Sequence, residues 1–319
     1  RALREFRIRG VKTNLVFLES LINNKNFVQG DYNTNFVDTN KDLYNYKPQK
    51  DRASKIVSYL GNIIVNGHPD IIGRHHKNSF TEVQIPSDVN IKSNNNYVED
   101  LKNLGADKFA EKIKDNPYTL ITDTTMRDAH QSLLATRMRT DDIVNIAEYY
   151  SKNLGNLFSL ECWGGATFDT SMRFLKEDPW DRLARLNSKA PNLLKQMLFR
   201  GSNAVGYKNY PDNVVKHFIK QSAESGIDVF RVFDSLNLID NMRVAIDEVR
   251  NQNKLCEGTI CYTNDVTDQN EKKYTLKYYI DLVKDLEKAG ANIIAIKDMA
   301  GLAKPNAIKL LVKEIKKET

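Results

Sequence analysis

Four side chains with catalytic potential fall within five positions of the segment 121–132: Arg127, Asp128, His130 and Gln131. The segment follows a short apolar run and precedes a helical pattern, so we expect the end of a strand and the loop after it. Proteins with alternating strands and helices place their chemistry in such loops. A carboxylate there can bind a metal ion, and a guanidinium can bind an anion. Taken by itself, the segment favours a solvated or capping role for Asp128 over that of a metal ligand.

Lys297 lies inside an otherwise apolar run, residues 292–301, that has the composition of a buried strand. Its ammonium group would be costly to remove from water if it were unpaired. Three arrangements relieve that cost: an ion pair with Asp298 or Asp234, a strongly lowered pKa, or carboxylation of the amine to a carbamate that binds a metal ion. The residues alone leave all three open.

Arg200 follows another apolar run and is suited to bind a substrate carboxylate, because its planar guanidinium matches two carboxylate oxygens. The structural alternative is an ion pair at the end of the strand, with Asp169 as its partner. The glycine pair at 164–165 would let the backbone approach a ligand closely, or would simply turn the chain. Tyr207 and Lys208, in the loop after Arg200, are compatible with a position on the surface.

These residues stand at the ends of strands in a regular alternation of strands and helices that begins near residue 118. Such alternation is typical of a parallel sheet. Six units fit an α/β fold, a (β/α)8 TIM barrel of about 250 residues when complete, truncated after about six βα units. In a barrel the polar strand ends converge on one mouth. A doubly wound open sheet is the competing fold, but it would normally carry a Gly-rich phosphate loop, and the sequence contains none. The predicted strands are residues 120–123, 157–163, 193–200, 229–234, 259–262 and 292–298, and the predicted helices are residues 140–153, 179–188, 213–225, 240–250, 276–289 and 305–317.

The first 115 residues differ in composition and predict a small mixed segment that belongs to neighbouring domains. Helical patterns occur at residues 13–21, 54–65 and 98–114. The chain opens as if in the middle of a helix and stops after a lysine-rich helix, so we expect it to be cut from a longer protein. The predicted divisions are 1–38, 39–115 and 116–319.

The remaining histidines offer little support for a second metal site. His68, His75 and His76 fall in one loop, but no acidic or thiol partner stands at ligand spacing. His217 lies in a predicted helix among lysines, which indicates a surface position. His130 could bind a metal ion or form hydrogen bonds.

The composition excludes several classes of protein. The chain has 319 residues, of which 41% are hydrophobic, enough for a substantial core. Its net charge of +6, from 47 basic and 41 acidic residues, is not gathered into a basic stripe with aromatics, so nucleic acid is not expected as a partner. No apolar run is long enough to span a membrane. The three cysteines form no disulfide framework, so we expect a cytoplasmic protein.

Five motifs together resemble the carboxyltransferase domain of the pyruvate carboxylase family: Asp-Thr-Thr-Met-Arg-Asp-Ala-His-Gln-Ser at 123–132, Trp-Gly-Gly-Ala-Thr-Phe-Asp at 163–169, Gln-Met-Leu-Phe-Arg-Gly-Ser-Asn-Ala-Val-Gly-Tyr at 196–207, Asp-Val-Phe-Arg-Val-Phe-Asp at 228–234 and Ala-Ile-Lys-Asp-Met-Ala-Gly at 295–301. The resemblance covers essentially all of 118–319. Upstream, residues 1–14 resemble the last part of a biotin carboxylase domain, and residues from about 45 to 78 resemble part of the allosteric and tetramerisation domain.

The resemblance implies a metal site and an enolate site. Asp128 would be a ligand of Mn²⁺ or Zn²⁺, and Lys297, as its carbamate, would be a second ligand. Arg127 and Gln131 would hold the substrate and its enolate. The family closes the metal site with a His-x-His pair on the next strand, which lies beyond the last residue of this chain, so the resemblance implies that the piece alone is inactive.

The resemblance also implies a substrate pocket and distant partners. Arg200 would bind the carboxylate of pyruvate, while Tyr207 and Asp169 would line the biotin side of the pocket. Biotin would arrive as carboxybiotin on a carrier domain outside this chain, after carboxylation with ATP and Mg²⁺ at another site. A homotetramer activated by acetyl-CoA is expected. Carboxyltransferase subunits of oxaloacetate decarboxylase or transcarboxylase share most of the motifs, and a non-catalytic assembly fragment is the alternative outside the enzymes.

Overall fold

The computed structural model describes residues 2–6, 8, 11–46, 52–68 and 95–319, which fall into two units, residues 1–84 and 85–319. The described part of the first unit is built of helices. His75 and His76 lie outside the described residues. In order, the helical elements of the first unit are α1 (Ala2–Glu5), α2 (Leu15–Ile22), α3 (Lys25–Gln29), α4 (Phe36–Thr39), the 3-10 turn η1 (Lys41–Tyr44) and α5 (Arg52–Asn66).

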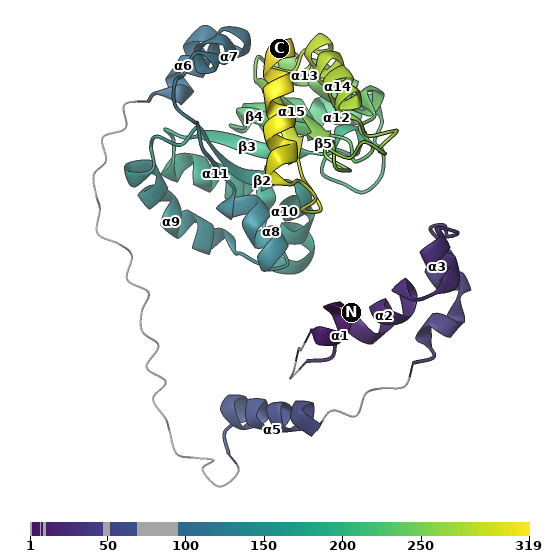
Figure 1. The fold of residues 1–319 in the computed structure, drawn as a ribbon. Coiled ribbons are helices and arrows are strands. Elements are labelled where there is room, and N and C mark those ends of the chain that lie inside the picture. The colour runs from purple at the N-terminus through teal and green to yellow at the C-terminus, as the bar shows by residue number, and fades with distance from the viewer. Residues whose placement is uncertain (1, 7, 9–10, 47–51, 69–94) are drawn as a thin grey trace. The chain divides into compact units, whose positions relative to one another are not determined.

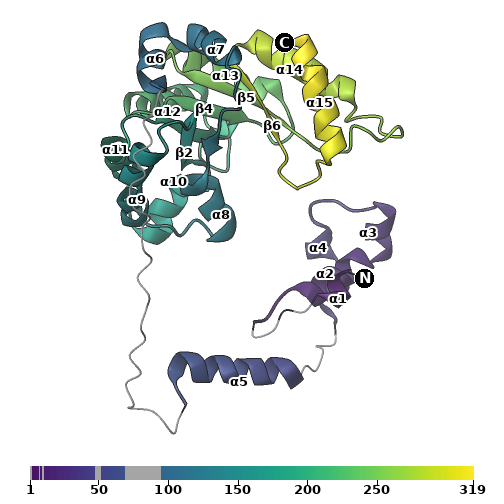
Figure 2. The same cartoon turned by 60° about the vertical axis from the view of Figure 1, so that its left-hand side comes forward.

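The second unit contains a sheet of six parallel strands that are neighbours in the order of the sequence, β1 to β6. The sheet is curled into a half-barrel (Figures 1 and 2), so the predicted truncated TIM barrel is confirmed. The described residues pair β1 only with β2 and β6 only with β5. The strands are β1 (Thr122–Asp123), β2 (Ser159–Gly164), β3 (Leu194–Phe199), β4 (Val229–Phe233), β5 (Leu255–Cys261) and β6 (Ile293–Lys297).

Helices cover the outside of the curled sheet, and each packs against a neighbour: α9 against α11, α12 against α13, α13 against α14 and α14 against α15. Pro179 and Pro305 open α11 and α15 at a position where proline costs no hydrogen bond. Gly290, with φ of 101°, ends α14 in the left-handed conformation. The helices around the sheet are α8 (His130–Leu133), α9 (Thr140–Asn153), α10 (Gly165–Thr170), α11 (Pro179–Lys189), α12 (Asp212–Glu224), α13 (Ile239–Asn251), α14 (Leu276–Ala289) and α15 (Pro305–Glu318), with short turns η3 (Thr125–Ala129), η4 (Ser171–Leu175) and η5 (Gly201–Asn203).

Three predictions about local structure are wrong. The predicted helix 98–114 is two helices, α6 (Tyr97–Leu104) and α7 (Ala106–Lys114), because Gly105 between them has φ of 78°. The predicted loop after β1 is helical, made of η3 and α8. The fifth strand begins at Leu255, four residues before the predicted start at 259.

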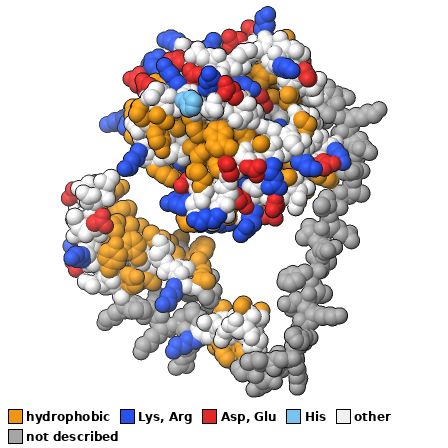
Figure 3. All heavy atoms as spheres, turned by 180° about the vertical axis from the view of Figure 1, so that it is seen from behind, with side chains coloured by type: hydrophobic (Ala, Val, Ile, Leu, Met, Phe, Trp, Pro, Cys, Tyr) orange, Lys and Arg blue, Asp and Glu red, His pale blue; other side chains and the backbone are white. Residues whose placement is uncertain are grey.

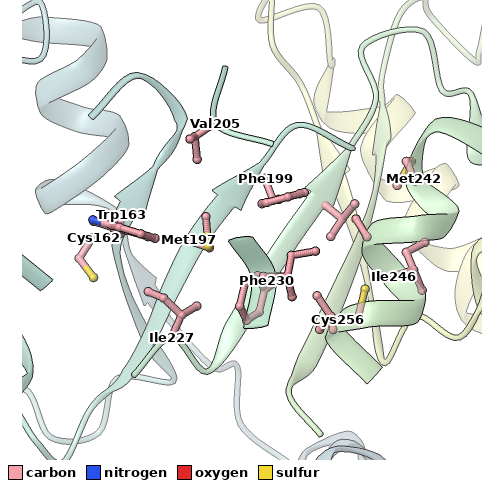
Figure 4. Packing of buried hydrophobic residues seen from close by; sticks show 14 of the residues in the cluster. Cys162, Trp163, Met197, Phe199, Val205, Ile227, Phe230, Met242, Ile246 and Cys256 are labelled. Atoms are coloured by element: carbon pink, nitrogen blue, oxygen red, sulfur yellow. The ribbon is translucent and has the colours of Figure 1, made fainter. Parts of the chain in front are cut away.

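Apolar side chains on the outer faces of the strands meet the helices in one buried core. Figure 4 shows Trp163, Met197 and Phe230 on adjacent strands, with Met242 and Ile246 of α13 packed beside them. Each of these five side chains is at most 1% exposed. Because this core holds every strand from β2 to β5 against its helices, it fixes where the strand ends point.

A second apolar cluster closes the amino ends of the strands. Phe109 of α7 and Tyr97 of α6 stack edge to face, and both contact Phe158, just before β2. The same cluster includes Leu194, Val229 and Leu255, the first residues of β3, β4 and β5. The helices α6 and α7 therefore plug one end of the strands, and the opposite, carboxyl end carries the polar residues.

On the face of the molecule in Figure 3, the basic and acidic side chains of the described residues are interspersed around hydrophobic ones. No helix in the described part of the chain is long and apolar enough to cross a membrane.

The end of β2 depends on a glycine. Gly164 has φ of 81°, and a Cβ there would meet the backbone carbonyl oxygen of Leu198 on β3. We predict that Gly164→Ala lowers the free energy of unfolding by about 3 kcal/mol or more, the sum of left-handed strain and overlap with β3. Gly301→Ala, at a φ of 66° but with open space around it, should cost only about 1–2 kcal/mol. Chemical denaturation of the two variants measures the difference, and equal costs would contradict the proposed overlap.

Candidate active site

The turn η3 carries Arg127 and Asp128 from the end of β1 into the mouth of the half-barrel. It has π-helical hydrogen bonding, with the Ala129 amide donating to the carbonyl of Thr124 at 3.1 Å. The carboxylate of Asp123, the last residue of β1, accepts the amide of Thr125 at 2.9 Å and fixes the start of the turn. Single π turns of this kind are common at functional sites, because they rotate side chains out of the ordinary helical positions.

Arg127 is the centre of the first group of predicted site residues. Its side chain is 2% exposed, and Glu161 of β2 binds its Nε and Nη2. Its Nη1 donates to Asp128 at 3.0 Å and to the amide oxygen of Gln131 at 3.4 Å. That oxygen also accepts the amide of Ala166, at the start of α10, at 3.2 Å. The side chains predicted to hold substrate are thus joined by direct hydrogen bonds.

Lys297 ends β6 and lies half-buried, with Nζ 5.3 Å from the ring centre of Phe233 at the end of β4. Neither predicted ion-pair partner is used: Asp298 accepts the amides of Leu302 and Ala303 at 2.9 Å, and Asp234 accepts those of Leu236 and Leu238. In the described part of the chain, Lys297 has no ion pair within 4.0 Å.

The pKa of Lys297 is lowered, first by burial and then by the positive charge of Arg127. Asp128 acts in the opposite direction, so the amine lies within electrostatic reach of that carboxylate. Of the three arrangements that the sequence left open, the structure excludes the ion pairs with Asp298 and Asp234. A lowered pKa increases the fraction of neutral amine, which is the form that reacts with CO2.

The other predicted residues form a second group beside β3. Arg200 follows β3 and donates from Nη1 to the carbonyl of Gly206 at 3.1 Å, while its guanidinium carbon lies 5.2 Å from the ring centre of Tyr207. Tyr207 donates its hydroxyl to Asp169 at 3.5 Å. The predicted alternative of an Arg200–Asp169 ion pair is wrong, because Asp169 pairs with Arg173 at 2.5 Å.

No hydrogen bond or ion pair between described residues joins the two groups directly, but β1, which precedes the first group, and β3, which precedes Arg200, flank the same strand, β2. A Cβ on Gly165 would lie 3.1 Å from the Gln131 amide oxygen and 3.4 Å from Leu198, near the end of β3. The backbone at Gly165 therefore lies close to Gln131 of the first group and to Leu198 of β3, the strand that precedes Arg200.

Sequence reasoning missed a set of charged residues inside the strands. Glu161 of β2 binds both Arg127 and Arg231 of β4, and Arg231 also binds Glu257 of β5. Glu257 accepts the side-chain amide of Gln196 on β3 at 2.8 Å. The available signal was one charged residue in each of three otherwise apolar runs, because a charge buried in a strand needs a partner of opposite charge or several hydrogen bonds.

The chain is related to known proteins over its whole length. No family model matches it. It is 52% identical over 317 residues to pyruvate carboxylase of Bacillus subtilis, which covers 99% of this chain and 28% of that protein. It is 50% identical over 319 residues to pyruvate carboxylase of Staphylococcus aureus, again over 28% of the relative. The chain is homologous to pyruvate carboxylases. It spans a little over a quarter of the length of these relatives.

Solved structures support the same relationship. The carboxyl transferase domain of Rhizobium etli pyruvate carboxylase matches 84% of this chain with 56% identity and a TM-score of 0.73, over 45% of that domain's chain. The complete multifunctional pyruvate carboxylase of the same organism matches 100% of this chain with 55% identity and a TM-score of 0.73, over 30% of its own length.

A divalent metal ion fits the site of this pyruvate carboxylase homologue only in part. The described residues contain no group of three His, Cys, Asp or Glu side chains that could hold a metal ion. Asp128, with a side chain 47% exposed, offers one carboxylate, and Lys297 offers an amine that could become a second oxygen ligand as a carbamate. Asp128 and Lys297 are therefore the two candidate ligands that we consider among the described residues.

The imidazole of His130 is buried. It is 1% exposed, its Nε2 lies 2.9 Å from the carbonyl oxygen of Met126, and its Nδ1 has no partner. Burial lowers its pKa from 6.5 to about 4. The idea that it binds a ligand has no support in this position, whereas His217, as predicted, is exposed on α12.

The buried His130 predicts an acid-sensitive stability. Between about pH 6.5 and 4 the unfolded chain would protonate this histidine while the folded chain would not, so its stabilising contribution is complete above pH 6.5 and is lost as the pH falls. We predict that His130→Gln removes about 3 kcal/mol of the acid-induced loss of stability between those limits. Urea unfolding at several pH values measures the slope. His217→Gln should leave it unchanged, and an unchanged slope in His130→Gln would contradict the assignment.

Proposed function

We propose that this chain is a section of a biotin-dependent pyruvate carboxylase, a ligase, and that residues 116–319 transfer a carboxyl group from carboxybiotin to pyruvate, giving oxaloacetate. The observation that carries the proposal is the 56% identity to the R. etli carboxyl transferase domain over 84% of this chain. That domain has been solved with pyruvate, with oxamate and biotin, and with pyruvate and biocytin.

The rest of the chain has a proposed place in the same protein. Residues 1–38 would be the C-terminal tail of a biotin carboxylase domain, and residues 39–115 a linker and part of an allosteric and tetramerisation domain. R. etli pyruvate carboxylase has been solved with its allosteric activator acetyl coenzyme A, which supports acetyl-CoA as the activator here. Biotin would be carried by a domain outside this chain, with ATP and Mg²⁺ acting at the biotin carboxylase site, and the whole protein would be a homotetramer. We propose the cytoplasm as its compartment, since the three buried cysteines are free thiols.

The reaction places specific demands on the site. The bond between the biotin nitrogen and the carboxyl carbon breaks, a proton leaves the methyl group of pyruvate for that nitrogen, and the methyl carbon bonds to the released CO2. Negative charge therefore develops on the carbonyl oxygen of pyruvate as its enolate forms. Groups that are already oriented toward that oxygen contribute most to catalysis, because they need no rearrangement as the charge appears.

The residues of the first group meet this demand. Arg127 Nη1, held between Asp128 and Gln131, would face the enolate oxygen with positive charge, and Gln131 would fix the substrate through its amide. An Mn²⁺ or Zn²⁺ ion bound by Asp128 and by Lys297 as its carbamate would supply further positive charge at the same oxygen.

The residues of the second group would bind the ends of the two substrates. Arg200 has no carboxylate partner in the described part of the chain. It would bind the carboxylate of pyruvate by donating two hydrogen bonds from its planar guanidinium group. Tyr207 is 65% exposed and Asp169 accepts its hydroxyl, so both can line the entrance on the side where biotin arrives.

Lys297 tests the proposed chemistry. In the full-length protein we predict that Lys297→Ala lowers ATP-driven oxaloacetate formation by about 100-fold or more, because the proposed carbamate ligand is lost. Biotin-dependent ATP cleavage, which would occur at another site, should persist. Lys304→Ala, which removes an exposed lysine after the same strand, is the matched control and should leave both rates unchanged. If carboxyl transfer survives unchanged in Lys297→Ala, the catalytic role of this domain is refuted.

Arg200 tests substrate binding. Arg200→Lys keeps the charge but loses the two-pronged contact, so we predict that the KM for pyruvate rises about tenfold or more. The exposed Arg243 pairs with Asp240, three residues earlier on α13, and Arg243→Lys is the control. Steady-state kinetics with varied pyruvate measures both. An unchanged KM in Arg200→Lys would exclude Arg200 as the carboxylate-binding residue.

A further inference from the structure

A chain of alternating charges crosses the interior of the half-barrel behind the mouth. It runs from Arg127 through Glu161 and Arg231 to Glu257, and successive members are ion-paired. The side chains are 2%, 0%, 19% and 7% exposed, in that order. Burying four charged side chains with so little access to water costs free energy, which points to a role beyond filling space.

Glu161 binds one edge of the Arg127 guanidinium group and leaves the other edge to the residues at the mouth. Oε1 of Glu161 binds Nε and Nη2 of Arg127, which is a two-point contact with one edge of the planar guanidinium. Only Nη1 remains for Asp128 and Gln131, the residues at the mouth. Glu161 therefore determines which way the guanidinium plane faces.

The second oxygen of Glu161 explains the presence of Arg231. A lone buried carboxylate paired with Arg127 would offset much of its positive charge. Because Oε2 of Glu161 binds Nη1 of Arg231, the negative charge of Glu161 is shared between two guanidinium groups. Glu257 in turn holds Nε of Arg231, and Gln196 anchors Glu257 to β3.

A second chain of hydrogen bonds ties these groups to the sheet. Gln196 accepts the hydroxyl of Ser159 at 2.6 Å, and Ser159 lies 2.8 Å from the hydroxyl of Thr122 on β1. The network therefore reaches all five strands from β1 to β5. Through Glu161, Arg127 is therefore connected by side-chain contacts to each of these strands.

We propose that Glu161 and Arg231 are positioning residues that orient the Arg127 guanidinium toward the developing enolate, with Glu257 as the outer anchor. This inference rests on the proposed function, in which Arg127 stabilises the enolate. The residues act through Arg127 and touch no substrate themselves. The alternative is a purely structural role, in which loss of the network lowers the free energy of unfolding without a specific effect on kcat.

The first test uses the full-length protein with Glu161→Gln, which keeps the shape of the side chain and removes its charge. We expect kcat for oxaloacetate formation to fall about 10- to 100-fold, as when a positioning partner is lost, while the KM for pyruvate changes less than about threefold. Biotin-dependent ATP cleavage should be unchanged. The matched control is Asp228→Asn, which breaks the 2.8 Å ion pair with Lys254 before β4, at the opposite end of the strands, and should leave kcat unchanged.

The second test separates positioning from stability. If Glu161 acts through Arg127, Glu161→Gln should lower kcat much less in an Arg127→Lys background than in the wild type, because the group to be positioned is already altered. The inference is overturned if Glu161→Gln lowers kcat by the same factor in both backgrounds, or if Glu161→Gln alone has the kcat of the wild type.

If Glu161→Gln does not fold, Glu257→Gln replaces it. That variant leaves the Arg127–Glu161 pair intact and should lower kcat about threefold at constant KM, and an unchanged kcat would overturn the inference. A wild-type protein that forms no oxaloacetate would instead refute the proposed function.

Discussion

The ion pair between Arg127 and Glu161 is the constraint on which the rest of the site depends. Both side chains lie inside the half-barrel, where an unpaired charge would be prohibitively costly, so each needs the other. Glu161 is fixed by β2, and β2 is fixed by the apolar core outside the sheet. The position of a guanidinium at the mouth is therefore set by packing between strands and helices some distance behind it.

The two groups of residues at the mouth differ in how firmly their side chains are held. Each guanidinium nitrogen of Arg127 has at least one side-chain partner, which restrains that group. Arg200 and Tyr207 are held mainly through backbone carbonyls and a ring contact, and Tyr207 is largely exposed. A rigid group suits the stabilisation of charge at one atom, and a looser group suits a ligand that must enter and leave. Lys297 stands between these extremes, half-buried and close to an aromatic ring, with its ammonium form disfavoured.

Much of the fold could be predicted from the sequence because its signals were local. Helices α9 and α14 have the predicted bounds, since apolar residues recur at helical spacing between clear ends. The start of β5 was missed because Glu257 interrupts the apolar run, and a charge ordinarily indicates surface. Its partner Arg231 is distant in sequence, and the parallel pairing of β4 with β5, which places Arg231 beside Glu257, brings them together. The break at Gly105 depends on a backbone angle that one glycine permits but does not require.

The site was predictable to the extent that strand ends in a barrel converge. Arg127, Asp128 and Gln131 lie within five consecutive residues of η3 and α8, so their proximity followed from the chain itself. The contacts of Asp169 did not follow from the chain in this way. Both Arg173 and Tyr207 bind its carboxylate, and that choice of partners depends on side-chain geometry. The roles of these residues toward metal and substrate remain predictions.

Within the described residues, β6 has a strand on one side only, and its five residues are all partly exposed. Its free side offers a row of backbone amides and carbonyls, flanked by the isoleucines at 293, 294 and 296. An uncovered edge of this kind readily adds a further strand from any chain that can supply one. We therefore expect self-association along β6 wherever no further strand covers this edge.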